Sequence, residues 1–80
     1  MSVTKEALDR FRETYPQLAI RKAYDYDAEH YIFMAMEPDV EEDFNDPFFL
    51  VSKTGMYAYN FVPFFDMPAF DRALENEVEL

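Results

Sequence analysis

The sequence contains no cysteine and a single glycine, Gly55. The absence of cysteine excludes disulfides, thiolate metal sites, iron–sulfur clusters and cysteine nucleophiles. With one glycine, the chain cannot form the glycine-rich loops that hold phosphates or dinucleotides. Long apolar runs are also lacking, because the longest is the six residues Tyr31–Met36. The sequence therefore predicts neither a signal peptide nor a membrane-spanning helix, and it favours a cytoplasmic protein.

Basic side chains are scarce. Seven Lys and Arg stand against seventeen Asp and Glu, which gives a net charge of −10. Five of the seven bases lie in residues 1–22, so residues 23–80 carry only Lys53 and Arg72. The negative electrostatic potential of such a chain opposes direct binding to nucleic acid or to an anionic membrane, and it favours a basic protein partner.

Aromatic residues are abundant, with nine Phe and six Tyr among 80 residues. Each large aromatic side chain buries about 150–250 Å², which helps a short chain to build a sufficient core. We expect residues 1–80 to form one small domain.

The N-terminal segment has the periodicity of an amphipathic helix. Its apolar side chains recur three or four residues apart, Ser2 or Thr4 can cap its start, and Pro16 discourages its continuation. These signals predict a helix over residues 3–15. The residues of the apolar stripe are Thr4, Ala7, Leu8, Phe11 and Tyr15.

Two hairpins are predicted between residues 17 and 64. From Gln17 the apolar period becomes two, with Leu18, Ile20, Tyr24 and Tyr26 expected on one face and Lys22 interrupting it. The apolar run 31–36 is the second strand of this hairpin. The segments "PFFLVSK" (47–53) and "MYAYNFVPF" (56–64) form the other, joined through Thr54–Gly55.

The final segment, "FDMPAFDRALENEVEL", predicts a short helix with Asp66 as its N-cap and fraying last residues. The fold class is therefore α+β. Its order is α-β-β-β-β-α, with a four-stranded antiparallel sheet and the N- and C-terminal helices packed on it. If both helices cover one face, the other face remains partly open and carries surplus aromatics.

The segment "EPDVEEDFNDPFF" (37–49) contains six carboxylates and no base. Its alternating oxygen ligands resemble a calcium loop that starts at Asp39. Such a loop requires Gly at its sixth position and a bidentate carboxylate at its twelfth, but these positions are Phe44 and Leu50. We therefore predict no metal or other cofactor. The segment is expected to link the two hairpins, with Phe44 either anchored to the core or exposed as an aromatic contact ringed by acids.

No pattern indicates catalysis, and the sequence predicts a protein that is not an enzyme. His30 is the only imidazole and is expected at an exposed turn, without a nucleophile or a matched acid beside it. A metal site of His30 with Asp27 and Glu29 would be crowded and would lack a second anchoring element.

Part of the sequence resembles a pattern found in small acidic phage and prophage proteins of uncharacterised function. The likeness covers about residues 24–76, through "EDFNDPFFLVSKTG", an aromatic strand and "FDMPAFDRALEN". In those proteins an acidic Asn-Asp-Pro-aromatic segment leads into a strand, a Lys-x-Gly turn and a C-terminal helix. The resemblance implies a phage accessory protein and transfers no catalytic residue.

The leading hypothesis is a non-enzymatic protein-interaction domain, acting through an aromatic sheet face or the acidic 37–46 loop. Its partner would be a protein, either a basic one or a second copy of the chain. The alternative is an acidic nucleic-acid mimic that inhibits a nucleic-acid-binding protein, because residues 37–46 and 66–79 hold eleven of the seventeen acids. The candidate interaction surface comprises Glu37, Asp39, Glu41, Glu42, Asp43, Phe44, Asp46, Tyr57, Tyr59 and Phe61.

Overall fold

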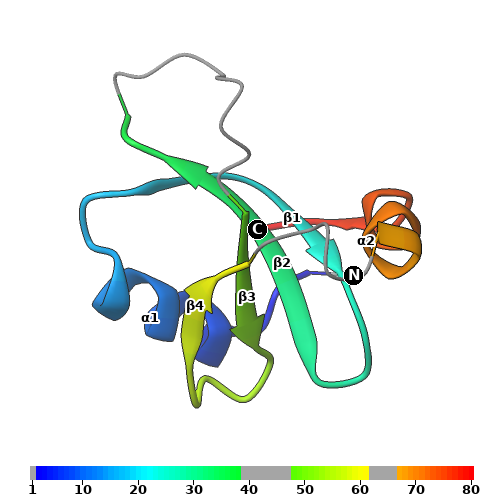
Figure 1. The fold of residues 1–80 in the computed structure, drawn as a ribbon. Coiled ribbons are helices and arrows are strands. Elements are labelled where there is room, and N and C mark those ends of the chain that lie inside the picture. Colours follow the sequence, from blue (N-terminus) through cyan, green and yellow to red (C-terminus); the bar gives the residue numbers. More distant parts are fainter. Residues whose placement is uncertain (1, 39–47, 62–66) are drawn as a thin grey trace.

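A computed structural model describes residues 2–38, 48–61 and 67–80. These residues form a mixed helix and strand fold around one antiparallel sheet with the strand order β4-β3-β2-β1-β5 (Figure 1). The elements in chain order are α1 (Lys5–Thr14), β1 (Ala19–Asp25), β2 (His30–Met36), β3 (Phe48–Ser52), β4 (Ala58–Asn60), α2 (Met67–Leu74) and β5 (Glu77–Val78). None of the described helices is long and apolar enough to cross a membrane.

Helix α1 forms where its periodicity predicts it. Thr4 is the N-cap, and its side-chain oxygen accepts a hydrogen bond from the backbone N–H of Ala7 at 3.2 Å. Ala7 and Phe11 are fully buried on the apolar face of the helix. The Phe11 ring lies 5.4 Å from that of Phe33 and 5.2 Å from that of Phe49, so α1 packs onto β2 and β3 through aromatic contacts.

The two helices pack on opposite faces of the sheet (Figure 1). The face under α1 is a cluster that contains Phe11, Phe33 and Val51. The opposite face is a second cluster, in which Phe70 of α2 packs with Ile32 of β2. Both faces of the central strands are therefore buried, which explains why the β2 sequence is apolar at nearly every position.

Strand β1 does not keep one apolar face throughout. The register with β2 shifts between Ile20 and Lys22, which identifies a β-bulge at Arg21. The extra residue inverts the alternation, so Ile20 packs with the α1 cluster while Tyr24 belongs to the α2 cluster. The expectation that Leu18, Ile20, Tyr24 and Tyr26 share one face is thus wrong, and the interruption at Lys22 follows directly after the bulge.

The sheet has five strands rather than the four expected. Helix α2 ends at Leu74, and the Asn76 side chain donates to the Arg72 carbonyl oxygen at 2.8 Å. The chain then extends along β1, where Val78 pairs with Ala23 and Glu77 with Tyr24. The carboxylates of this last segment are unfavourable at a helix C-terminus but are compatible with an edge strand. Pairing with β5 also gives backbone groups of β1 hydrogen-bond partners within the protein.

Candidate functional site

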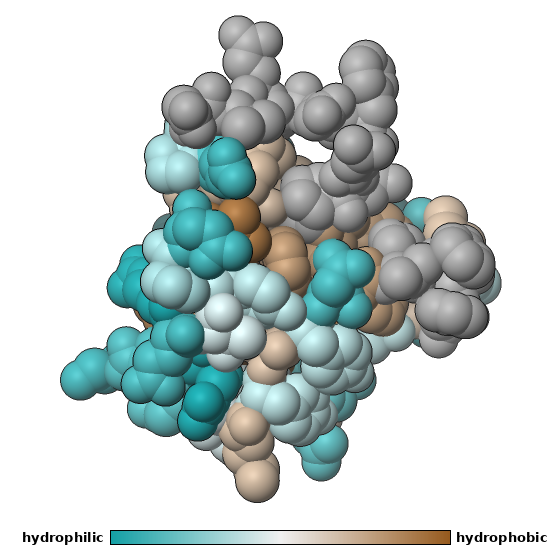
Figure 2. Space-filling view, turned by 60° about the vertical axis from the view of Figure 1, so that its left-hand side comes forward, coloured by the Kyte–Doolittle hydropathy of each residue, from teal (hydrophilic) through white to brown (hydrophobic). Residues whose placement is uncertain are grey.

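Three of the large hydrophobic side chains that are exposed among the described residues lie on the β3–β4 hairpin. Met56 is 74% exposed, Tyr57 42% and Tyr59 48%. The two tyrosine rings are stacked, with centroids 5.8 Å apart and planes 24° apart. Figure 2 shows that hydrophilic colours cover most of the described surface in this view, with small hydrophobic areas between them. We call Met56, Tyr57 and Tyr59 the tyrosine surface.

Helix α1 fixes the hairpin that carries this surface. The Thr4 hydroxyl donates to the Lys53 carbonyl oxygen at 2.7 Å, and the Arg10 Nε–H donates to the Gly55 carbonyl oxygen at 2.8 Å. Gly55 has φ 75°, which the turn requires, and a Cβ there would lie 2.6 Å from the Glu6 carbonyl oxygen. The turn predicted at Thr54–Gly55 is confirmed, and it is held against the start of α1.

Tyr57 of the tyrosine surface is also the last of three polar side chains joined by hydrogen bonds. Asp27 Oδ1 and Oδ2 lie 2.8 and 3.0 Å from His30 Nδ1. The other ring nitrogen of His30, Nε2, is hydrogen-bonded to the hydroxyl of Tyr57. His30 therefore connects the β1–β2 turn to the β3–β4 hairpin. We call Asp27, His30 and Tyr57 the relay.

The charge of Asp27 determines how the relay is protonated. Burial raises the pKa of Asp27, but hydrogen bonds from the Glu29 backbone and from His30 outweigh this and leave the pKa below its ordinary value of 3.8. At neutral pH the Asp27 carboxylate is thus an acceptor only, so His30 Nδ1 carries a proton. In the neutral imidazole, Nε2 then accepts the hydroxyl proton of Tyr57.

Lys53, next to the tyrosine surface, is engaged within the protein. Its ammonium lies 2.7 Å from Asp25 Oδ1 and 5.0 Å from the ring centroid of Tyr31. Its backbone N–H donates to the Glu29 carbonyl oxygen at 2.8 Å. The charge of Lys53, the base nearest to the tyrosine surface in sequence, is therefore compensated by Asp25. Asp27 and Glu29 are exposed.

The structure separates the residues predicted for the candidate surface. Phe61 is half-buried, and its ring lies 5.5 Å from that of Tyr26, so it belongs to the core under α2 rather than to the tyrosine surface. Glu37 is exposed at the end of β2, and its carbonyl oxygen accepts a hydrogen bond from Arg21 at 3.1 Å. The remaining predicted positions, Asp39, Glu41, Glu42, Asp43, Phe44 and Asp46, lie outside the described residues.

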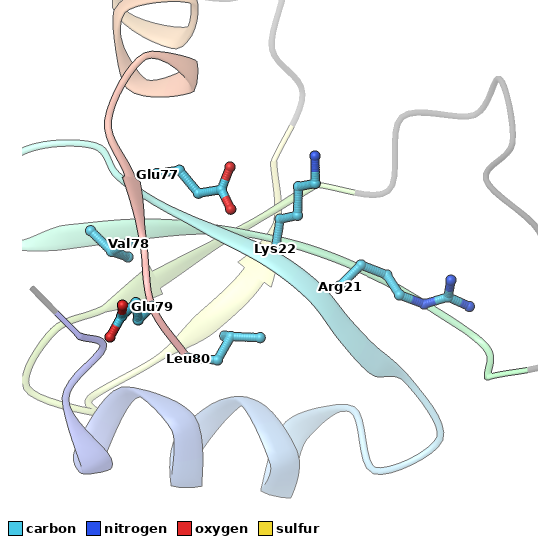
Figure 3. Close-up of a pocket in the computed structure, with 6 residues that line it drawn as sticks. All are labelled: Arg21, Lys22, Glu77, Val78, Glu79 and Leu80. Carbon is cyan, nitrogen blue, oxygen red and sulfur yellow. The ribbon is translucent and has the colours of Figure 1, made fainter.

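A pocket lies at the β5 edge of the sheet, across the sheet from the β3–β4 hairpin, and is lined by residues of β1 and of the C-terminal segment. It has a volume of about 320 Å³. Figure 3 shows the Lys22 and Glu77 side chains on the same side of β1, with Arg21 extending away from them. Bases and carboxylates are mixed here, so the pocket favours no single ligand charge. Across the described ranges, no three His, Asp or Glu side chains lie close enough together to hold a metal ion.

Sequence reasoning missed the relay. His30 was expected to be an exposed turn residue, but its side chain is only 16% exposed. The spacing of Asp27 and His30 is a local signal for a hydrogen bond between them. Tyr57 is 27 positions further along the chain, and only the pairing of β2 with β3 and of β3 with β4 brings its hydroxyl to the imidazole.

No protein-family model matches the chain, and comparison with curated proteins and with solved structures finds no significant match.

Proposed function

We propose that this protein is a non-enzymatic protein-interaction domain that binds a basic segment of a partner protein through the tyrosine surface. The observation that carries the proposal is the stacked, exposed pair of Tyr57 and Tyr59 on a hairpin anchored to α1. Tyrosine is enriched where interfaces bind tightly, because its rigid ring gives contact area at a low cost in side-chain entropy.

Electrostatics support a basic partner. The protein has a net charge of −10, Glu29 lines a pocket together with Met56 and Tyr57, and Asp27 is connected to Tyr57 through His30. Lys53 is paired with Asp25 and so does not repel an approaching cation. Arg and Lys side chains of a partner can also lie over tyrosine ring faces within about 6 Å of the centroid. The setting in a phage accessory protein rests on the resemblance of residues 24–76 alone.

Selection of peptides from a random display library tests this function. The domain is immobilised, and selected peptides are measured by calorimetry against the native protein and two variants. Met56→Ser with Tyr59→Ser removes the apolar area of the surface. Met67→Ser is the matched control, because Met67 is an exposed methionine on α2, away from the hairpin.

We expect selected peptides to be rich in Arg and Lys and to bind the double variant about tenfold more weakly or worse, a loss of about 1.4 kcal/mol. Binding to Met67→Ser should be unchanged. Affinity should survive an increase from about 0.1 M to about 0.5 M salt with less than a tenfold loss. Peptides that bind the double variant as tightly as the native protein would contradict the proposal.

The salt dependence distinguishes the acidic nucleic-acid mimic. A mimic binds through many charge pairs, so its affinity for a basic nucleic-acid-binding protein falls steeply as salt rises.

Self-association is measured first, by light scattering with chromatography at both salt concentrations. A native dimer that is stable at both salt concentrations and is lost in the double variant would assign the tyrosine surface to a second copy instead of to a basic partner.

A further inference from the structure

The geometry points to a second property of this surface, which does not depend on the proposed function: the Tyr57 hydroxyl is a nucleophile, activated by His30, that accepts an acyl group from a small neutral acyl donor. A carboxylate, an imidazole and a hydroxyl follow one another in the order used by enzymes that activate a hydroxyl with a general base. Such an arrangement is recognised by its geometry and not by sequence position.

Each member of the relay is held in place. Asp27 Oδ1 accepts the backbone N–H of Glu29 at 2.8 Å and also contacts His30 Nδ1 at 2.8 Å. His30 is fixed by its backbone as well, because its carbonyl oxygen accepts the N–H groups of Tyr26 and Asp27. The third side chain, Tyr57, is stacked on Tyr59. These contacts keep His30 Nε2 directed at the Tyr57 hydroxyl, so the side chains need little rearrangement before proton transfer.

A pocket of about 320 Å³ lies beside Tyr57 and can admit a small molecule. Its lining includes Met56, Ser52 and Thr54 together with Glu29 and Lys53. The Lys53 ammonium is paired with Asp25. Because the Lys53 charge is matched by Asp25 and Glu29 adds a negative charge, the site disfavours an anionic donor. A neutral acyl donor therefore fits best.

The chemical step is a simple acyl transfer. The Tyr57 oxygen attacks the acyl carbon while its proton passes to His30 Nε2. The bond from the acyl carbon to the leaving group then breaks, and His30 returns the proton to that group. The products are a phenyl ester on Tyr57, the protonated leaving group and a neutral His30, so atoms and charge balance without an oxidant or a metal.

Tyr59 is an internal control for this reactivity. Tyr57 and Tyr59 are similarly exposed, at 42% and 48%, and each has the other as its stacking neighbour. They differ in that Tyr57 is bonded to His30. A difference in reactivity between them therefore reports the imidazole and not accessibility.

The test uses N-acetylimidazole at a low molar ratio, with proteolysis and mass spectrometry to measure acetylation of each tyrosine over time. We expect Tyr57 to react about tenfold faster than Tyr59 or more, since general-base assistance contributes about 10²–10⁴-fold in active sites. His30→Gln, which removes the base but keeps a polar side chain, should bring the ratio to about one. Asp27→Asn should lower the ratio, because the imidazole is then less well oriented.

The same ratio measured on the native protein in concentrated urea controls for variants that fail to fold. It should be about one there, since unfolding removes the relay. Equal rates for Tyr57 and Tyr59 in the folded native protein would overturn the proposal. A preference for Tyr57 that survives His30→Gln in a folded variant, or that persists in urea, would also overturn it.

Discussion

The Arg10 Nε–H donates a hydrogen bond to the Gly55 carbonyl oxygen across 2.8 Å, and so joins α1 to the tip of a hairpin 45 residues later in the chain. At the N-cap of the same helix, the Thr4 hydroxyl donates to the Lys53 carbonyl oxygen. The position of the tyrosine surface therefore depends on the helix as much as on the sheet. A change at either contact should affect both stability and the orientation of Tyr57.

Gly55→Ala should destabilise the protein by about 1–3 kcal/mol, because φ 75° is strained for a residue with a Cβ and that atom would approach the Glu6 carbonyl oxygen. Urea unfolding followed by circular dichroism measures the loss. Met56→Ala, at an exposed neighbour in the same turn, should change the free energy of unfolding by less than about 0.5 kcal/mol. Equal stability of Gly55→Ala and the native protein would contradict this account of the turn.

Thr4→Ala should cost about 1–2 kcal/mol, since it removes the N-cap of α1 and also the hydroxyl that donates to Lys53. Thr4→Ser keeps the hydroxyl and should recover most of this free energy. Thermal and urea unfolding of both variants provide the measurement. If Ser were as destabilising as Ala, the threonine methyl group, and not the hydrogen bonds, would be responsible.

Phe11→Ala should be the most damaging single change at α1, with a loss of about 3–5 kcal/mol. The ring is fully buried and has three aromatic neighbours, Tyr15, Phe33 and Phe49. Because such a loss can exceed the total stability of a small domain, Phe11→Leu is measured in parallel and should retain a cooperative transition at lower urea. A loss below about 1 kcal/mol for Phe11→Ala would show that the cavity refills.

Local signals made parts of the fold predictable from the sequence. The stripe of α1, the Thr4 cap and the Gly55 turn each depend on neighbouring residues, and each forms as expected. The bulge at Arg21 was not predictable in this way, because it depends on which register lets both β1 segments bury their apolar side chains. Strand β5 likewise forms because β1 offers an open edge, a property of the folded sheet.

The candidate site was likewise predictable from the sequence only where it depends on neighbouring residues. Tyr59 lies on the edge strand β4, Tyr57 directly precedes this strand, and both are exposed. Phe61 is expected on the same face by alternation, but its ring packs against that of Phe70 of α2. Periodicity assigns a residue to a face, but it does not say which element covers that face. The relay required a contact between two turns distant in sequence, so its members could only be recognised together in three dimensions.

The lowered pKa of Asp27 predicts how stability depends on pH. Because the pKa is lower in the folded protein than its ordinary value of 3.8, the unfolded chain binds more protons between the two pKa values. The contribution of the Asp27 charge to the free energy of unfolding is therefore fully present above the unfolded pKa and is lost as the pH falls through the folded pKa.

Asp27→Asn should be less stable than the native protein at pH 6, and its stability should approach that of the native protein as the pH drops below about 3.8. Urea unfolding of both proteins from pH 6 down to about pH 2.5 measures the difference between their free energies of unfolding. The effects of the other carboxylates, which both proteins contain, cancel in this difference. A gap between them that stayed constant or widened in acid would show that the Asp27 charge does not stabilise the turn.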